Sequence, residues 1–133
     1  MEQLKPGLTG TFELEVTREY CTSRGGPWVF ATPAMVLFVE RSCHELVEPY
    51  IGAGRNSVGV VVNIRHMAPT LEGMNVRAEI ELAEVDRRRL KFKARVFDDI
   101  EQVGECEHER FVIDVDKAAE RLAQKAAAMK AKR

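Results

Sequence analysis

A run of six consecutive apolar residues, 34–39, limits the fold of this chain more than any other feature of its sequence. Thr32, just before the run, can accept a hydrogen bond as the N-cap of a helix, and Pro33 suits the first helical position because it has no N–H to satisfy there. These signals predict a helix with Thr32 as its N-cap and Pro33 as its first residue. Because the run has no polar face, we expect the helix to be buried on all sides. Glu40 follows the run, where a buried charge needs either a partner or a role in a site.

Five further segments alternate apolar and polar residues, which is the pattern of half-buried strands. One precedes the helix and four follow it, joined by short polar connections that suit hairpins. The segments are 10–18, 57–66, 74–85, 90–97 and 103–115. Consecutive strands with one wet face indicate an antiparallel sheet. The sequence therefore predicts an α+β architecture in which the sheet wraps around one long buried helix, the arrangement called the hotdog fold.

The alternation also predicts which strand residues share a face. In the segment 57–66, we expect one face to carry Val58, Val60, Val62, Ile64 and His66. In the last segment, the alternation sets Phe111, Ile113 and Val115 against Val112 and Asp114.

Length, charge and hydropathy limit the class of protein. The 133 residues suit one ordinary domain, which we place at 1–116, followed by a basic C-terminal helix or tail at 117–133. The net charge of −1 gives no reason to expect nucleic acid or an anionic membrane as a partner. No apolar run is long enough to span a bilayer, and the first residues lack the apolar core of a secretion signal.

The cysteines indicate the redox compartment. Cys21, Cys43 and Cys106 are odd in number, widely spaced and without a CxxC pair. This pattern favours free thiols in a reducing cytoplasm over a disulfide framework or a zinc site. We therefore expect a cytoplasmic protein without a metal site.

Two basic segments allow more than one interpretation. The tail has a helical composition with a weak apolar stripe of Ala119, Leu122, Ala126 and Met129. Its six basic residues fit a solvated helix face and a frayed end better than a binding site for an acidic partner. The arginines at 87–89 are either phosphate contacts or part of a solvated hairpin.

No glycine-rich phosphate loop, HExxH, GxSxG or Cys/His cluster is present, so the candidates for chemistry are polar residues at the ends of apolar elements. His66 is either a hydrogen-bonded structural residue or a general base, since imidazole titrates near neutral pH. Glu40 is either a paired structural carboxylate or a group that activates a hydroxyl or a water. Thr32 is first of all an N-cap, but the N-terminus of a buried helix also favours a developing oxyanion.

Five other residues lie where a ligand could approach. Gly59 interrupts a strand, which suggests close approach of a ligand or of another backbone. Trp28 and Phe30 precede the helix and are either core residues or walls of an acyl pocket. We interpret His108 as structural, and Arg110 either as an ion-pair partner of its neighbouring glutamates or as a ligand contact.

These candidates occur together in a recognisable order. The chain reads FATPAM at 30–35, then Glu40, SVG at 57–59, RH at 65–66 and HER at 108–110. In this combination it resembles the fluoroacetyl-CoA-specific thioesterase family of hotdog proteins. The resemblance extends from about Gly7 to about Lys117, and the ATxxM helix start together with the terminal HER makes it specific.

The resemblance implies hydrolysis of an acyl-CoA thioester at a site between two protomers. It implies that Thr32, Glu40 and His66 form the catalytic set. Gly59 matches the family's glycine near the thioester carbonyl, and Arg110 matches its arginine in the last strand. No cofactor is implied, because coenzyme A is part of the substrate, and the protein is expected to be a homodimer.

One segment departs from the family's pattern. The fluoroacetyl-CoA enzyme has a longer lid segment with a phenylalanine before the helix, whereas residues 21–27 here are short and contain none. We therefore expect a different acyl group as the substrate and not a role in fluoroacetate resistance.

Three other functions fit parts of the sequence. A hotdog hydratase pairs an Asp with a His five residues later, but Val61 stands five residues before His66. A non-catalytic acyl-CoA-binding module would keep a pocket without needing Thr32, Glu40 and His66 together. A protein with a purely structural or protein-interaction role would have no affinity for CoA esters.

Overall fold

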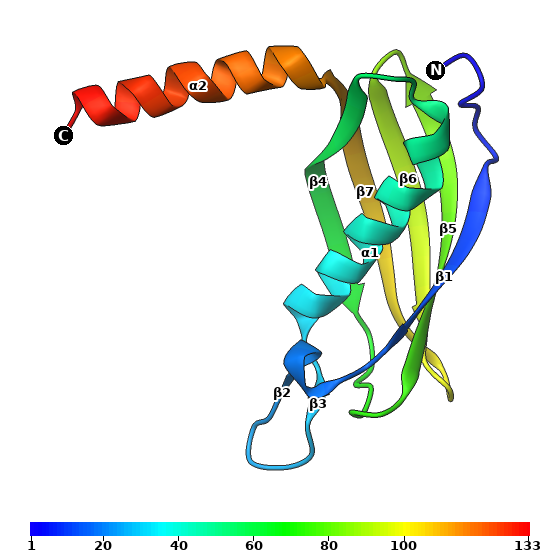
Figure 1. The fold of residues 1–133 in the computed structure, drawn as a ribbon. Coiled ribbons are helices and arrows are strands. Elements are labelled where there is room, and N and C mark those ends of the chain that lie inside the picture. Colours follow the sequence, from blue (N-terminus) through cyan, green and yellow to red (C-terminus); the bar gives the residue numbers. More distant parts are fainter.

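The computed structural model describes residues 1–133, in which a five-stranded antiparallel sheet curves around one long helix (Figure 1). The helix α1 (Thr32–Val47) lies across the concave face of the sheet. The strands are β1 (Thr9–Glu15), β4 (Arg55–His66), β5 (Asn75–Asp86), β6 (Arg89–Phe97) and β7 (Gln102–Asp114). They pair in the order β1-β5-β6-β7-β4, which makes β1 and β4 the edge strands. The predicted α+β hotdog fold is confirmed.

Smaller elements border this unit. A hairpin of two short strands, β2 (Cys21–Thr22) and β3 (Val29–Phe30), lies at the start of α1. Short 3-10 turns, η1 (Arg18–Tyr20) and η2 (Glu48–Tyr50), flank β2 and the end of α1. The last helix, α2 (Val115–Ala131), extends away from the sheet past β4 (Figure 1). Neither α1 nor α2 is long and apolar enough to cross a membrane.

The core forms between α1 and the inward residues of the central strands. The alternation predicted for β5 and β6 is confirmed, because eight apolar residues on the inner face of these two strands are at most 3% exposed. These residues are Val76, Ala78, Ile80, Leu82, Leu90, Phe92, Ala94 and Val96. Met35, Val39 and Cys43 of α1 are buried against this layer.

The expectation that α1 is buried on all sides is wrong for the single chain. Leu37 remains 39% exposed, and Pro33 and Arg41 on the same helix face are exposed as well. One layer of sheet covers one face of a helix, so the opposite face stays open. The apolar residues of that open face are therefore available for contact with another surface.

The faces of β4 also differ from the expected pattern, because the register with β7 shifts between Gly59 and Val61. Directly opposite residues in a sheet point to the same side. Gly59 lies opposite the buried Arg110, whereas Val62 lies opposite the buried His108, so odd and even positions both face inward on either side of Val60. This β-bulge places Val58 on the outer face and keeps Gly59 and His66 on the concave face.

Candidate active site

Thr32 is the first residue of α1, and its side chain does not cap the helix. The N-cap position belongs to Ala31, with extended backbone angles and no capping side chain. The expectation that Thr32 is the N-cap is therefore wrong by one residue. Because the hydroxyl is not used for capping, it is free for another partner.

That partner is His66, at the end of β4. The Oγ1 atom of Thr32 lies 2.8 Å from Nδ1 of His66. When the hydroxyl donates this hydrogen bond, Nδ1 acts as the acceptor, and the neutral ring carries its proton on Nε2. An imidazole in this state can take the hydroxyl proton, which is the arrangement of a nucleophile and its general base.

The surroundings of His66 keep it in the neutral form. Burial lowers the pKa of His66 below its usual value of 6.5, and the backbone of Ala68 offsets part of this effect. The Nε2 atom is buried and forms no hydrogen bond within the chain. At neutral pH the ring is therefore neutral, and in the tautomer that accepts the Thr32 hydrogen bond its Nδ1 can take a proton.

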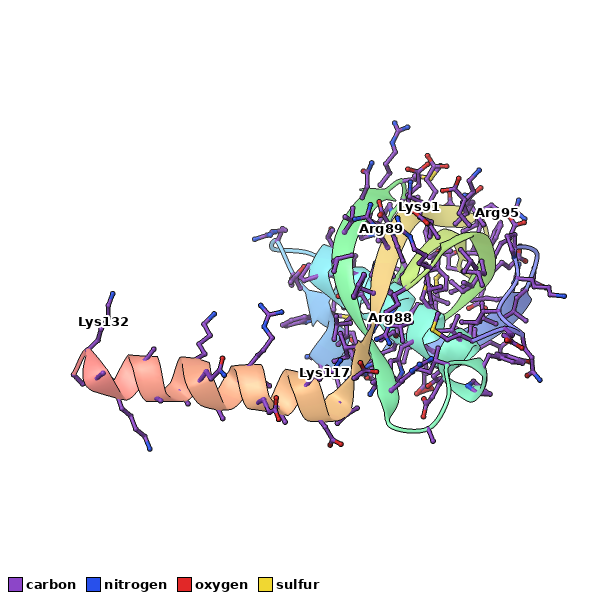
Figure 2. All side chains as sticks on the ribbon, turned by 90° about the horizontal axis from the view of Figure 1, so that it is seen from above. Arg88, Arg89, Lys91, Arg95, Lys117 and Lys132 are labelled. Carbon is purple, nitrogen blue, oxygen red and sulfur yellow. The ribbon has the colours of Figure 1, made fainter.

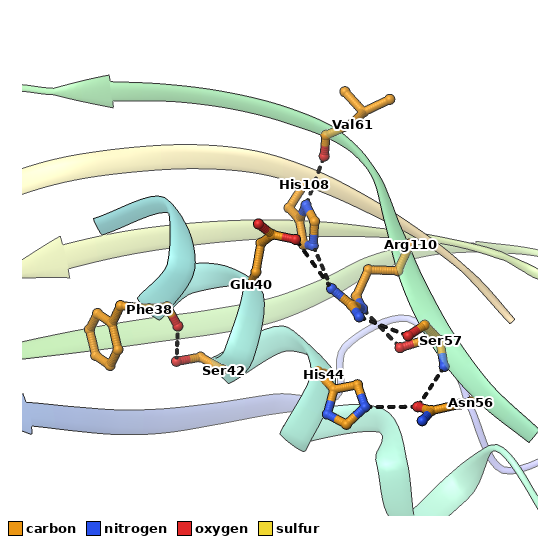
Figure 3. A network of polar contacts seen from close by, with 9 residues as sticks. All are labelled: Phe38, Glu40, Ser42, His44, Asn56, Ser57, Val61, His108 and Arg110. Carbon is orange, nitrogen blue, oxygen red and sulfur yellow. Dashed lines mark hydrogen bonds and ion pairs between the residues drawn. The ribbon is translucent and has the colours of Figure 1, made fainter. Parts of the chain in front are cut away.

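A second polar centre lies further along α1, where Glu40 faces Arg110 of β7 (Figure 3). Their closest atoms, Oε2 and Nη1, are 3.9 Å apart. The guanidinium also donates from Nε to Oγ of Ser57 at 2.8 Å and from Nη2 to the Ser57 carbonyl at 2.9 Å. With only 7% of its side chain exposed, Arg110 is a fixed cation against the half-buried Glu40 carboxylate.

His108 completes the support of Arg110. Its Nδ1 lies 2.7 Å from the carbonyl of Val61, which can only accept, so Nδ1 carries the proton. The free lone pair on Nε2 then accepts from Nη1 of Arg110 at 3.1 Å. Burial is the main reason that the pKa of His108 is lowered, and the Arg110 charge lowers it further. The ring is therefore a neutral acceptor that orients the guanidinium.

Gly59 lies directly beneath this pair. A Cβ atom at position 59 would be 2.7 Å from Oε2 of Glu40 and 3.3 Å from Cε1 of His108. A side chain at this position would therefore displace the carboxylate, and glycine is required by a close approach of groups from α1 and β7.

The structure thus brings the predicted site residues together in two groups. Thr32 and His66 form one, and Glu40 joins Gly59 and Arg110 in the other. Eight residues of helix separate Thr32 from Glu40, which corresponds to about 12 Å of rise. No hydrogen bond or ion pair joins Glu40 to Thr32 or His66 within the chain.

The two remaining candidates, Phe30 and Trp28, lie outside these two groups. Phe30 is 1% exposed in the core, so the single chain offers none of its surface to a substrate. Trp28 is partly exposed and packs under the guanidinium of Arg18 at 4.5 Å. A hollow of about 740 Å³ lies on the outer face of the sheet among charged side chains such as Glu79 and Arg95, away from every candidate residue. Nowhere in the chain do three or more His, Cys, Asp or Glu side chains gather as metal ligands would.

Two residues of the Arg110 network were missed from the sequence. Ser57 was noted only as part of the SVG motif, without a role of its own, and His108 was interpreted as structural without a named partner. A usable signal did exist for His108, because residues two apart on a strand share a face and Arg110 was already a candidate.

A hotdog sheet with a hydroxyl–imidazole pair at the start of its central helix defines the class of hotdog thioesterases. Comparison with known proteins identifies the family. The model of the fluoroacetyl-CoA-specific thioesterase family matches residues 14–116. The chain is 35% identical over 99 residues to the fluoroacetyl-CoA thioesterase of Streptantibioticus cattleyicolor, which covers 74% of this chain and 71% of the relative.

Solved structures agree with this assignment. The fluoroacetyl-CoA thioesterase FlK superimposes with a TM-score of 0.85 at 30% identity, covering 92% of this chain and 97% of the other. A thioesterase superfamily member from Thermus thermophilus shares the fold, with a TM-score of 0.90 at 24% identity over 98% of this chain and 99% of the other. The chain belongs to the fluoroacetyl-CoA-specific thioesterase family, and it is a thioesterase.

Proposed function

We propose that this thioesterase hydrolyses an acyl-CoA ester to free coenzyme A and a carboxylic acid, with Thr32 and His66 at the reacting carbonyl. The observation that carries this proposal is the 2.8 Å contact between the Thr32 hydroxyl and Nδ1 of His66. Membership of the family, and a curated relative named fluoroacetyl-CoA thioesterase, support CoA esters as the substrate class.

The pair suggests a two-stage reaction. The Thr32 oxygen attacks the thioester carbonyl while its proton passes to Nδ1 of His66, and the departing CoA thiolate takes that proton back. Water then hydrolyses the acyl-threonine ester, with Glu40 as the base that activates it. The N-terminal end of α1, where Thr32 lies, favours the negative charge that develops on the carbonyl oxygen in both stages. No cofactor takes part, because CoA enters as part of the substrate.

The separation of the two polar centres supports a site shared by two protomers. Glu40 is about 12 Å along α1 from the Thr32 of its own chain, which is too far for a single reaction centre. Edge strand β4 leaves four valines exposed, at 41% for Val58, 53% for Val60, 44% for Val61 and 39% for Val62. Unpaired apolar edges are usually covered in stable proteins. Antiparallel pairing of β4 with the same strand of a second copy would cover them and bring Glu40 of one copy towards Thr32 of the other.

The acyl group is proposed to differ from fluoroacetate. The segment between β2 and β3, residues 23–28, is a short loop with Gly25 and Gly26 in open surroundings and no phenylalanine. Its one large apolar side chain, Trp28, packs against Arg18, and the rest of the loop offers little apolar surface to close over a small acyl group. Discrimination of a single fluorine atom is therefore not expected from it.

We also place the reaction in the cytoplasm. The three cysteines are unpaired, and unpaired thiols are typical of a reducing compartment.

Thiol release from a panel of CoA esters tests this function. The panel contains acetyl-, fluoroacetyl-, branched-chain and aromatic acyl-CoA, and each is assayed with the wild type and with His66→Ala. We expect turnover of at least one ester by the wild type, a loss of most of that rate in the variant, and no preference for fluoroacetyl-CoA. Esters that raise the melting temperature without being hydrolysed would instead indicate a non-catalytic binding module. Equal rates for the two proteins would contradict the role of His66.

A further inference from the structure

The C-terminal helix α2 has no cover within its own chain. It runs for 17 residues, about 26 Å by helical rise, and none of its residues is buried. Seen from above, it leaves the sheet and passes into open space beside the molecule (Figure 2). Leu122 is 67% exposed and Met129 is 50% exposed. Most helices in proteins owe their stability to packing of an apolar face. A surface outside this chain would supply that packing for α2.

One face of α2 is suited to such packing. Its residues recur with spacings of four and three, which places them on one side of the helix. This apolar stripe consists of Val115, Ala119, Leu122, Ala126 and Met129. A helix that is solvated on all sides does not need a continuous apolar stripe that contains Leu and Met. The stripe defines the contact face of α2.

The charges of α2 are complementary to those of the rest of the chain. Residues 115–133 carry six basic and two acidic side chains, a net charge of +4. The whole chain has a net charge of −1, so residues 1–114 carry −5. From Arg121 onward, no basic side chain of α2 forms an ion pair within the chain, whereas Arg88, Arg89, Lys91 and Arg95 of the sheet all do. The helix is thus suited to an acidic surface such as residues 1–114 of a second copy.

The start of α2 fixes its direction. The Val115 N–H donates to the Gly54 carbonyl at 2.9 Å, and Asp114 pairs with Arg55 and Arg88. From this anchored position the helix passes β4 at the Arg55 end and continues beyond the edge of the sheet (Figure 1). A second copy paired along β4 would therefore lie within reach of the helix.

Antiparallel pairing of the two β4 strands determines which part of the second copy the helix would contact. The Arg55 end of one β4 then lies beside the His66 end of the other. That end of the domain exposes Met67 at 52% and Ile100 at 74%. It also carries Asp99 and Glu101, which form no ion pair within their own chain. With strands about 4.8 Å apart, a helix of about 26 Å is long enough to reach from β7 across β4 to these residues.

We propose that α2 is a dimerisation arm, which crosses the β4 edge and packs its apolar stripe on the domain of a second copy of this chain. The inference rests on the proposed homodimer and is independent of the thioesterase chemistry. In this dimer the arm contacts two acidic residues and two exposed apolar residues at the far end of the second copy.

Two double variants of the full-length protein test the arm. Leu122→Gln with Met129→Gln removes the apolar side chains of the stripe and keeps good helix formers. Ala127→Gln with Ala131→Gln introduces the same residue on the opposite side of the helix and serves as the control. Sedimentation equilibrium measures the dimer dissociation constant of each variant and of the wild type. We expect the stripe variant to raise it at least about tenfold, because buried apolar surface is lost on binding, and the control to stay within about twofold of the wild type.

The other outcomes overturn the proposal. Equal dissociation constants for both variants and the wild type would show that the stripe does not contribute to the dimer. A wild-type protein that remains monomeric would contradict both the proposed arm and the proposed homodimer. Binding of the wild type, but not the stripe variant, to phosphatidylserine vesicles with unchanged dimerisation would assign the stripe to a lipid surface instead. Because thiol release is assayed separately, failure of the arm and failure of the thioesterase function are distinguishable.

Discussion

At the scale of single residues, Gly59 leaves no room for a side chain beside Glu40, because a Cβ atom there would be 2.7 Å from Oε2. The carboxylate lies at the end of a flexible side chain, so it can move away from an added methyl group at little cost to the fold. That movement would change the position of the Glu40 carboxylate relative to Arg110. The residue at position 59 therefore affects the chemistry more than the stability.

We predict that Gly59→Ala lowers kcat by about 10- to 100-fold, the usual cost of misplacing a reacting group by about 1 Å. The melting temperature should change little, and Val60→Ala, which alters an exposed neighbour, should retain the wild-type kcat. The test consists of steady-state rates and thermal melts of the three proteins. Full activity of Gly59→Ala would mean that the position of Glu40 is unimportant.

The pH dependence of activity follows from His66. Because burial lowers its pKa below 6.5, the ring stays in the base form as the pH falls through 6.5 and is protonated only at lower pH. We predict that the acid limb of kcat/KM lies below pH 6.5, measured between about pH 5 and 8. An acid limb at or above 6.5 would show that His66 is not the base in the free enzyme.

Residue-scale prediction from sequence succeeded where the signal is local. The Thr32-Pro33 pair placed the start of α1 to within one residue, since helix-start signals act within one turn. The partner of the hydroxyl could not be predicted, because Thr32 and His66 are 34 residues apart and meet only through the fold. Arg110 was a candidate from the sequence, but its contacts with Ser57 and Glu40 could not be predicted for the same reason.

At the scale of elements, the β-bulge at Val60 sets which residues of β4 face the site. The extra residue lets Gly59 and His66 share the concave face although one position is odd and the other even. In a regular strand with the same residues, one of the two would point to the outer face.

We predict that deleting Val60 removes the bulge but keeps the facing of both halves of β4, because Gly59 stays opposite Arg110 and Val61 then follows it opposite Glu109. The melting temperature should fall by less than about 5 °C, since only the local bend of the strand changes. Val60→Ala keeps the length of the strand and should melt within about 2 °C of the wild type. Differential scanning calorimetry of both variants makes the comparison. A deletion variant that does not fold would mean that the two halves of β4 depend on the bulge itself.

The bounds of the elements were largely predictable. The four strands after α1 begin and end within two residues of the expected positions, because alternation is read from neighbouring residues. The bulge was not predictable, since it depends on the register of β4 against β7. The open face of α1 at Leu37 was missed because burial depends on how many layers cover a helix, which the helix sequence does not specify.

At the scale of the whole molecule, the proposed dimer predicts complementation between inactive chains. A heterodimer of Thr32→Ala and Glu40→Gln protomers, isolated with two different affinity tags, contains one site with both wild-type residues and one with neither. We expect about half of the wild-type rate per dimer, as for one intact site of two related by symmetry. No activity in the heterodimer would place both residues of each site in one chain.

The central claim is that the Thr32 hydroxyl, activated by His66, attacks the thioester. The most direct test compares kcat of Thr32→Ala, Thr32→Ser and the wild type on the ester that the wild type turns over fastest. Serine keeps the hydroxyl within reach of Nδ1, so we expect it to retain activity within about tenfold, whereas alanine should lose at least about 100-fold. A Thr32→Ala variant that hydrolyses the ester at the wild-type rate would contradict the claim.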